Sequence, residues 1–294
     1  MEKSNILIGS DFAAVHAYLC ADGYVCKNLP SQKTKYYRIG LRNTCPELLE
    51  DFQTRFDNVF HKKPIISKQQ DRCLIGSREL FYFLTENFGS FYSADWSIPK
   101  CLVKKELLSS WLRAFFDCEG WVEAVKGKNR AVAAESINEK GLNDIRNYLK
   151  NLFGIHSTIR PRSGRTTSVL GIYGKKNIIK FSNQIGFTHP LKRQKLDAAI
   201  NSFVNYDWQF PENEQELKDF VTAFLKQRIN LTTGRIQVCS NKKKNIIKLS
   251  KLLKRFASIN CRVSKTRFNS FGTRYFELSI NKKQDVTKLK ELIL

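Results

Sequence analysis

The cysteines of this chain follow no metal-binding pattern. Eight are present, but no two are spaced as Cys-x-x-Cys and none clusters with histidine, so we expect no structural zinc site. No apolar run approaches the ~18 residues of a membrane-spanning helix, and the first ten residues do not have the pattern of a signal peptide. We therefore expect a cytoplasmic protein of a reducing compartment with no membrane partner, and leave an organellar matrix open.

Acidic residues are scarce in comparison with basic ones. The sequence has 27 Asp+Glu against 50 Lys+Arg, which gives a net charge of +23. Such an excess is typical of a protein that binds a polyanion, and nucleic acid is the leading candidate; a merely soluble basic surface is the alternative. A hydrophobic content of 42% excludes general disorder, and 294 residues are enough for two or three domains.

Two short stretches, residues 17–25 (AYLCADGYV) and 111–122 (WLRAFFDCEGWV), share one pattern. Each is an apolar helical run that ends at an acidic residue followed by glycine. The acids, Asp22 and Glu119, meet the negative end of the helix dipole, which is unfavourable unless a cation is bound there. The glycines that follow are expected to let the backbone turn sharply out of the helix. Two such ends brought together would form a paired-carboxylate metal site.

The chain contains three copies of one unit in steps of roughly 95 residues. Each unit is predicted to run helix, strand pair, helix, strand pair, helix, because amphipathic helical segments alternate with basic, strand-like ones. The matching closing segments are residues 75–89, 172–187 and 278–294. We predict three repeats, over residues 1–98, 99–204 and 205–294.

The third copy keeps the scaffold but lacks the acids. Its opening helix is expected over residues 217–230, where Lys226 and Arg228 align with Asp117 and Glu119. Residues 206–216 are polar and are predicted to be a linker. From residue 201 onward the chain has 19 Lys+Arg and 8 Asp+Glu. We expect an accessory DNA-binding unit, with a scaffold that covers part of the catalytic core as the alternative.

The two motifs resemble those of a known protein family. Residues 15–23 (VHAYLCADG) and 112–120 (LRAFFDCEG) resemble the nonapeptide of the LAGLIDADG homing endonucleases, and the matched helix pattern extends over residues 10–200. The resemblance implies an α+β fold, in which two pseudo-twofold-related αββαββα units form a β-saddle. In this chain, a third, degenerate unit of the same type would follow.

The resemblance also implies the composition of the active site. The motif helices would pack together through small residues and bring the two acids side by side beneath DNA. The metal site would comprise Asp22, Gly23, Glu119 and Gly120, with Mg²⁺ as cofactor and Mn²⁺ as a substitute. Lys192 is the best match to the family's pocket lysine and would polarise water or stabilise negative charge. The catalytic residues are thus predicted to be Asp22, Glu119 and Lys192.

Three positions depart from the family pattern. Cys20 stands where the first motif often has Asp, and Trp121 follows the second motif in place of a basic residue. In the first unit, Lys100 is only a loose counterpart of the pocket lysine, so the two halves of the site are predicted to be unequal.

DNA would be read by alternate residues of the strands, since a two-stranded ribbon fits the major groove. Ile39 and Leu41 share a parity that should face the core, and residues of the other parity should face DNA. Arg165 is expected at a hairpin tip beside Gly164. The predicted DNA-binding residues are Tyr36, Arg38, Arg42, Gln70, Arg72, Arg160, Arg162 and Arg165.

These observations together predict a site-specific double-strand DNA endonuclease that acts as a monomer and is encoded by an intron or similar mobile element. An intron-encoded RNA maturase, which would bind host intron RNA, and a non-cleaving DNA-binding protein of the same fold are the alternatives. Two intact acids favour the nuclease, because a pure binder has no use for them. An intein is not expected, because the Cys or Ser start and the His-Asn end are missing.

Overall fold

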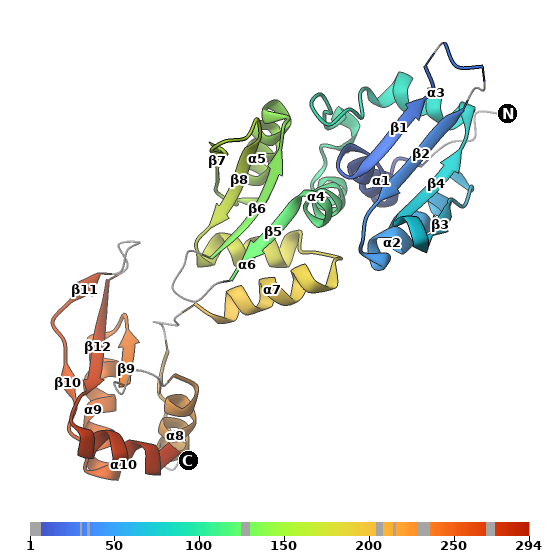
Figure 1. Ribbon diagram of the computed structural model, residues 1–294. Helices are drawn as coiled ribbons and strands as arrows, with labels where there is room; N and C mark the ends of the chain where they lie inside the picture. Colours follow the sequence, from blue (N-terminus) through green and yellow to red (C-terminus); the bar gives the residue numbers. More distant parts are fainter. Residues whose placement is uncertain are drawn as a thin grey trace. The chain divides into compact units, whose positions relative to one another are not determined.

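The computed structural model describes residues 7–29, 31–33, 36–124, 130–203, 208–213, 216–228, 236–268 and 274–293. The chain divides into two compact units, residues 1–203 and 204–294 (Figure 1). Helices and antiparallel sheets occur in both, which confirms the predicted α+β fold. Among the described residues, no helix is both long and apolar enough to cross a membrane.

The first repeat is a four-stranded antiparallel sheet with helices. Its strand order is β1-β2-β4-β3. Its elements are α1 (Ser10–Cys20), β1 (Gly23–Lys27), β2 (Tyr37–Arg42), α2 (Pro46–Phe60), β3 (Ile65–Ser67), β4 (Arg72–Gly76) and α3 (Arg78–Phe88). A 3-10 turn, Lys68–Gln70, joins β3 to β4. As the parity predicts, Ile39 and Leu41 are fully buried while Arg38 and Arg42 are exposed.

The second repeat has the same order of elements and one additional helix. Its sheet runs β5-β6-β8-β7, again antiparallel throughout. Its elements are α4 (Lys105–Glu119), β5 (Gly120–Glu123), β6 (Ala131–Ser136), α5 (Glu139–Phe153), β7 (Ser157–Pro161), β8 (Ser168–Tyr173), α6 (Lys175–Gln184) and α7 (Pro190–Asn201). The additional helix is α7, which contacts both α6 and β5.

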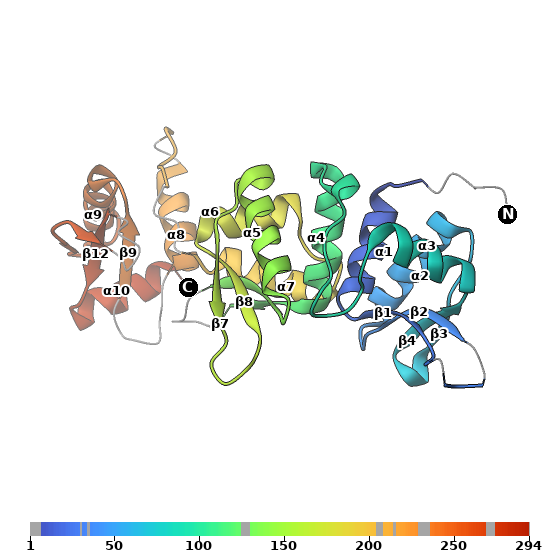
Figure 2. The ribbon, with the colours of Figure 1, turned by 90° about the horizontal axis from the view of Figure 1, so that it is seen from above.

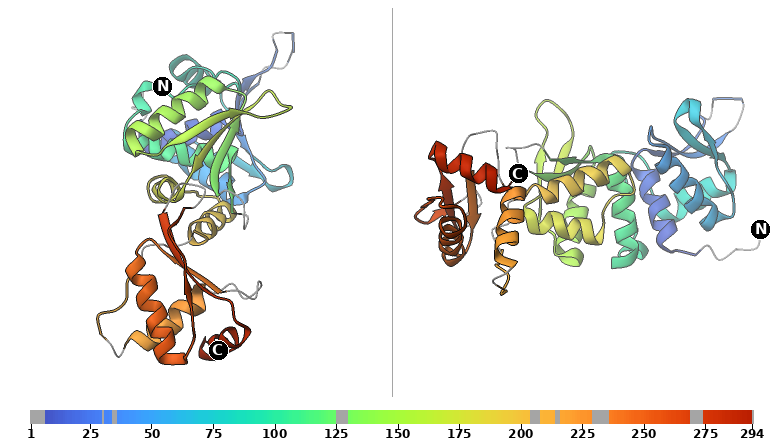
Figure 3. Two further views of the ribbon diagram at one scale, coloured as in Figure 1. Left: turned by 90° about the vertical axis from the view of Figure 1, so that its left-hand side faces the viewer. Right: turned by 90° about the horizontal axis from the view of Figure 1, so that it is seen from below.

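The two repeats share one hydrophobic core, because α1 and α4 pack against each other along their lengths. Small side chains, Ala14 and Ala17 on α1 and Ala114 on α4, are buried there. The Trp111 indole donates a 3.1 Å hydrogen bond to Nδ1 of the fully buried His16, across the two helices. Figure 2 shows these helices on one side of the unit and the strands of both sheets on the other; Figure 3 gives further views, with α7 in yellow.

Residues 204–294 form a smaller unit with its own core. Its elements are α8 (Glu216–Arg228), β9 (Ile236–Ser240), α9 (Lys243–Ala257), β10 (Arg262–Val263), β11 (Arg267–Phe268), β12 (Arg274–Ile280) and α10 (Lys283–Ile293). Strand β12 is central: it pairs with β9 on one side and with β10 and β11 on the other. The counterpart of β1 and β5 would fall in residues 229–235, outside the described residues, as does the side chain of Arg228.

The prediction that residues 206–216 are a linker is wrong for Trp208. Its side chain is only 6% exposed and belongs to the core of residues 204–294. The indole donates a 2.8 Å hydrogen bond to the Cys239 carbonyl. The buried face of α8, with Val221 and Leu225, lies in the same core. The apolar face of α8 is therefore buried within the smaller unit.

Helix α9 separates charge from apolar surface, as its sequence predicts. Ile246, Leu249 and Leu253 are fully buried. Its exposed basic side chains are Lys243, Lys244, Lys248, Lys251, Lys254 and Arg255. One face of the smaller unit is therefore strongly positive.

Candidate active site

Each motif helix runs almost directly into the first strand of a sheet. Helix α1 ends at Cys20 and β1 begins at Gly23; α4 ends at Glu119 and β5 begins at Gly120. Neither helix has a basic residue in its last turn. The negative end of each helix dipole therefore faces an acidic side chain, and a cation from another element is needed there.

The glycine after each acid is required by close packing of the backbone. Gly120 has an extended backbone with φ −95°, which any residue can adopt, and neither motif glycine has a positive φ. A Cβ at Gly120 would lie 2.5 Å from the Phe116 carbonyl oxygen, and one at Gly23 would lie 2.6 Å from the Tyr18 carbonyl oxygen. The expected conformational role of these glycines is therefore wrong, because lack of space, and not a special turn, excludes a side chain.

The structure brings Asp22 and Glu119 close enough for their charges to interact. Both side chains are partly buried. The Asn43 side-chain amide donates a 2.8 Å hydrogen bond to Asp22 Oδ2, which fixes that carboxylate. Burial, followed by the negative charge of Asp22, raises the pKa of Glu119 to about 7. Two carboxylates thus repel each other at the helix ends.

Helix α7 supplies a cation at this place. The ammonium group of Lys192 donates hydrogen bonds to the carbonyl oxygens of Asp117, Cys118 (3.2 Å) and Phe116 (3.4 Å). These oxygens belong to the last turn of α4, where helix carbonyls lack the usual partner within the helix; the Phe116 oxygen also accepts from the Gly120 N–H at the end of the helix. Burial lowers the pKa of Lys192, and the surrounding acidic groups oppose that shift. The predicted pocket lysine therefore lies against the end of the second motif helix.

Asp117 positions α7, a role that the sequence interpretation missed. Its carboxylate is 1% exposed and accepts hydrogen bonds from the backbone N–H groups of Thr188 (3.0 Å) and His189 (2.9 Å). These groups lie at the N-terminus of α7, where a carboxylate is favourable. Burial raises the pKa of Asp117 to about 6 although these bonds oppose the shift. In the first motif, the position equivalent to Asp117 is Cys20, whose Sγ lies 3.5 Å from His16 Nδ1.

The first half of the site has no equivalent of this arrangement among the described residues. Lys100, the loose counterpart of Lys192, is exposed and lies in a 3-10 turn, Lys100–Leu102. The two halves of the site therefore differ, as the sequence predicts.

The paired carboxylates fit a divalent cation. In the described part of the chain, no three His, Cys, Asp or Glu side chains come together. A cation at Asp22 and Glu119 would therefore complete its shell with backbone oxygens, water or a phosphate, which is common for Mg²⁺. The raised pKa of Glu119 agrees with this fit, because a cation bound beside two carboxylates that repel each other stabilises their charged forms.

The first sheet presents a basic hollow of about 480 Å³. Arg38, Arg42, Gln70 and Arg72 line it together, so four of the predicted DNA-binding residues lie on one surface. Alternation predicts Gln70 on a strand. The structure instead places it in the 3-10 turn between β3 and β4, and from there it lines the hollow. Tyr36 precedes β2, and the Arg38 guanidinium lies 4.2 Å above its ring.

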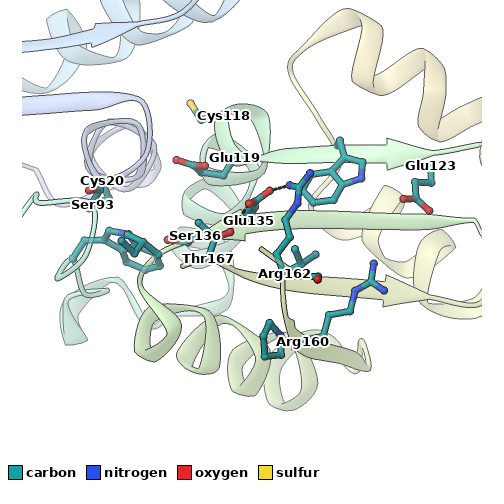
Figure 4. Close-up of a pocket in the computed structure, with 16 residues that line it drawn as sticks. Cys20, Ser93, Cys118, Glu119, Glu123, Glu135, Ser136, Arg160, Arg162 and Thr167 are labelled. Carbon is teal, nitrogen blue, oxygen red and sulfur yellow. Dashed lines mark hydrogen bonds and ion pairs between the residues drawn. The ribbon is translucent and has the colours of Figure 1, made fainter. Parts of the chain in front are cut away.

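The second sheet presents a larger hollow of about 970 Å³ (Figure 4). Arg160 and Arg162 line it, and the hollow extends to Glu119 and Trp121. Arg165 lies in the loop between β7 and β8, where its backbone N–H donates to the Arg162 carbonyl. This position agrees with the predicted hairpin tip.

The sequence pattern does not single out Glu135 as a functional residue. It lies on β6 and forms ion pairs with Arg162 and, at 3.6 Å, with Arg165. Alternation along β6 could have placed it on the same face as Trp121, but its pairing with a distant hairpin could not be foreseen.

Residues 106–186 match a family model described as a LAGLIDADG-like domain. The glutamine--fructose-6-phosphate aminotransferase (isomerizing) of Methanocaldococcus jannaschii is 25% identical over 224 residues, which are 71% of this chain and 19% of that protein. The replication factor C small subunit of Thermococcus kodakarensis is 35% identical over 97 residues, 32% of this chain and 10% of that protein. The chain thus spans about a fifth or less of the length of these relatives.

Three of the solved structures that the chain matches differ in what they contain. I-DmoI in complex with DNA and Mn is 15% identical, with a TM-score of 0.48, and covers 61% of this chain and 98% of that chain. The homing endonuclease I-WcaI bound to its DNA recognition sequence is 15% identical, with a TM-score of 0.46, and covers 66% and 88%. Full-length WhiA from Thermatoga maritima is 16% identical, with a TM-score of 0.44, and covers 98% and 93%. The chain thus contains a LAGLIDADG-like domain over residues 106–186 and carries two motifs that resemble the LAGLIDADG nonapeptide.

Proposed function

We propose that this protein is a site-specific, divalent-metal-dependent endonuclease that acts on double-stranded DNA as a monomer. One observation carries the proposal: Asp22 and Glu119 lie close enough for their charges to interact, at the ends of two packed helices, with Lys192 against one of those ends. A protein that only binds DNA gains nothing from two carboxylates that repel phosphate. The match of residues 106–186 to a LAGLIDADG-like domain supports the same function.

Asp22 and Glu119 would hold the cation, Mg²⁺ in the first place and Mn²⁺ as a substitute. A divalent cation at this site supplies Lewis-acid activation of water and neutralisation of phosphate charge. Lys192 would place its ammonium group where negative charge develops on the phosphate. Asp117 acts indirectly, since it holds the N-terminus of the helix that carries Lys192.

The two sheet faces would bind the DNA. The exposed arginines of both hollows can contact phosphates and guanine edges, so contacts to either are expected. The basic face of α9 would add sequence-independent affinity from the smaller unit, because exposed lysines neutralise phosphates and release counterions.

The test is selection of cleaved sites from a randomised duplex library in the presence of Mg²⁺. Wild-type protein should yield one long, asymmetric consensus with both strands cut. Asp22→Asn should bind the selected sites and leave them intact, because the amide keeps the shape of the side chain and loses the charge that holds the cation. Robust cutting by that variant would refute the two-acid site.

Two other outcomes would each replace the proposal. Tight sequence-specific DNA binding without cleavage by the wild-type protein would indicate a non-cleaving DNA-binding protein of the same fold. Preferential binding of intron RNA over duplex DNA would indicate a maturase.

A further inference from the structure

Three carboxylates, Glu119, Glu123 and Glu135, line the hollow of the second sheet, and Glu135 is the one that forms ion pairs with arginines. Glu135 projects from β6 into the hollow that Arg160 and Arg162 line (Figure 4). Its side chain is only 16% exposed. No acidic residue lines the corresponding hollow of the first sheet among the described residues. A negative charge on a surface that meets phosphates weakens binding, so its presence calls for an explanation.

Glu135 organises one end of the β7–β8 hairpin. One carboxylate oxygen forms an ion pair with Arg162 Nη1. The other accepts a 2.5 Å hydrogen bond from the Thr167 hydroxyl and lies 3.6 Å from Arg165 Nη1. A guanidinium group has five N–H donors in a rigid, planar fork, so a carboxylate on one edge fixes the direction of the others.

We propose that Glu135 is a specificity-determining residue that aims Arg162 at a guanine edge; this rests on the proposed DNA-reading function of the sheet. The side chain of Arg162 is 41% exposed, so it is accessible to solvent while it forms an ion pair with Glu135. An arginine restrained in this way pairs with the O6 and N7 atoms of guanine at a smaller entropic cost than a mobile one. The carboxylate also repels phosphate, which lowers binding to unrelated sequences.

Glu123 provides a matched control. It lines the same hollow and is exposed. Within the described residues it forms no ion pair with an arginine. Glu123→Gln removes the same charge from the same surface as Glu135→Gln, but it should free no guanidinium.

The experiment selects bound sequences from a randomised duplex library with EDTA present, for wild type, Glu135→Gln and Glu123→Gln. Both variants should bind unrelated duplex more tightly, because each loses a negative charge. Only Glu135→Gln should lose preference for guanine at one or two adjacent positions, by roughly tenfold, which is the discrimination of one well-formed arginine–guanine pair. Because binding and not cleavage is measured, a protein that binds DNA without cutting it refutes the proposed function and still tests this role.

A double-mutant cycle separates positioning from direct contact. Arg162→Ala should relax the same positions, and adding Glu135→Gln to it should relax them no further. Glutamine retains an acceptor for the Thr167 hydroxyl, and an unchanged melting temperature would show that the hairpin is intact. An unchanged base preference in Glu135→Gln, or an equal loss in the Arg162→Ala background, would overturn the proposal.

Discussion

Glu119→Gln should stabilise the metal-free protein, and only above mildly acidic pH. The pKa of Glu119 is about 7 in the folded protein against an ordinary value of 4.5. A raised pKa means that the folded state holds the proton more tightly than the unfolded chain. The free energy of unfolding of the wild type therefore falls as the pH rises from about 4.5 to about 7. Glutamine is uncharged throughout and avoids this cost.

The size of the effect follows from the shift. Each pKa unit corresponds to about 1.4 kcal/mol, so a rise from 4.5 to about 7 amounts to about 3–4 kcal/mol. This is an upper value, because the partly exposed carboxylate is also solvated by water. The stability difference between variant and wild type should be complete near pH 8 and nearly absent near pH 4.5.

Urea unfolding in EDTA, followed by tryptophan fluorescence, measures this difference at both pH values. Three of the four tryptophans, Trp96, Trp111 and Trp121, lie in the unit that contains the site. Glu123→Gln controls for the loss of one exposed negative charge. Added Mg²⁺ should stabilise the wild type more than Glu119→Gln. A stability gain that is the same at both pH values would refute the reasoning.

Three further predictions concern the helices and the smaller unit. Asp117→Ala should lower the free energy of unfolding by roughly 2–3 kcal/mol, because buried N–H groups of Thr188 and His189 lose their acceptor; an unchanged denaturation midpoint would contradict this. Truncation after Phe203 should leave a cooperatively melting fragment that cuts its site more weakly, whereas aggregation would show that the two units depend on each other. Replacing several exposed lysines of α9 should flatten the salt dependence of DNA affinity by about 0.9 for each phosphate that is no longer neutralised, with sequence preference unchanged in binding selections.

Local pattern accounts for what the sequence could predict. Each motif helix ends at, or within two residues of, the acid that precedes glycine, and the apolar residues predict burial: α1 is buried on all sides from Phe12 to Cys20, and α4 buries one face. Strand parity separates buried Ile39 and Leu41 from exposed Arg38 and Arg42 in the same way. These features depend on residues a few positions apart, which a sequence shows directly.

Contacts between distant segments account for what the sequence could not predict. Asp117 and Thr188 are 71 residues apart, and nothing near either residue predicts that one caps a helix that begins at the other. The same holds for Glu135 and the hairpin that it holds. The lack of space at Gly23 and Gly120 arises mainly from the preceding turn of the motif helix, and the sequence does not show how closely the chain passes that turn.

The linker prediction is wrong for Trp208, although the sequence contains a pattern that predicts its burial. Residues 207–211 (DWQFP) repeat the pattern of residues 95–99 (DWSIP), ahead of the opening helices of the third and second repeats. Both tryptophans bind an asparagine in the same way. The side-chain amide of Asn138 donates to the Trp96 carbonyl, and that of Asn245 donates to the Trp208 carbonyl. Reading this pentapeptide as part of the repeat would have placed Trp208 in a core and not in a linker.

The two reciprocal caps between α4 and α7 keep the candidate active site independent of the sheet faces. The Asp117 carboxylate of α4 holds backbone N–H groups at the start of α7, and the Lys192 ammonium group of α7 holds backbone carbonyls at the end of α4. None of these contacts uses a side chain of β6, β7 or β8. Residues on those strands can therefore be exchanged while Lys192 stays in place. Under the proposed function, such a protein can acquire a new target sequence by substitutions in one layer and retain its reaction in the other.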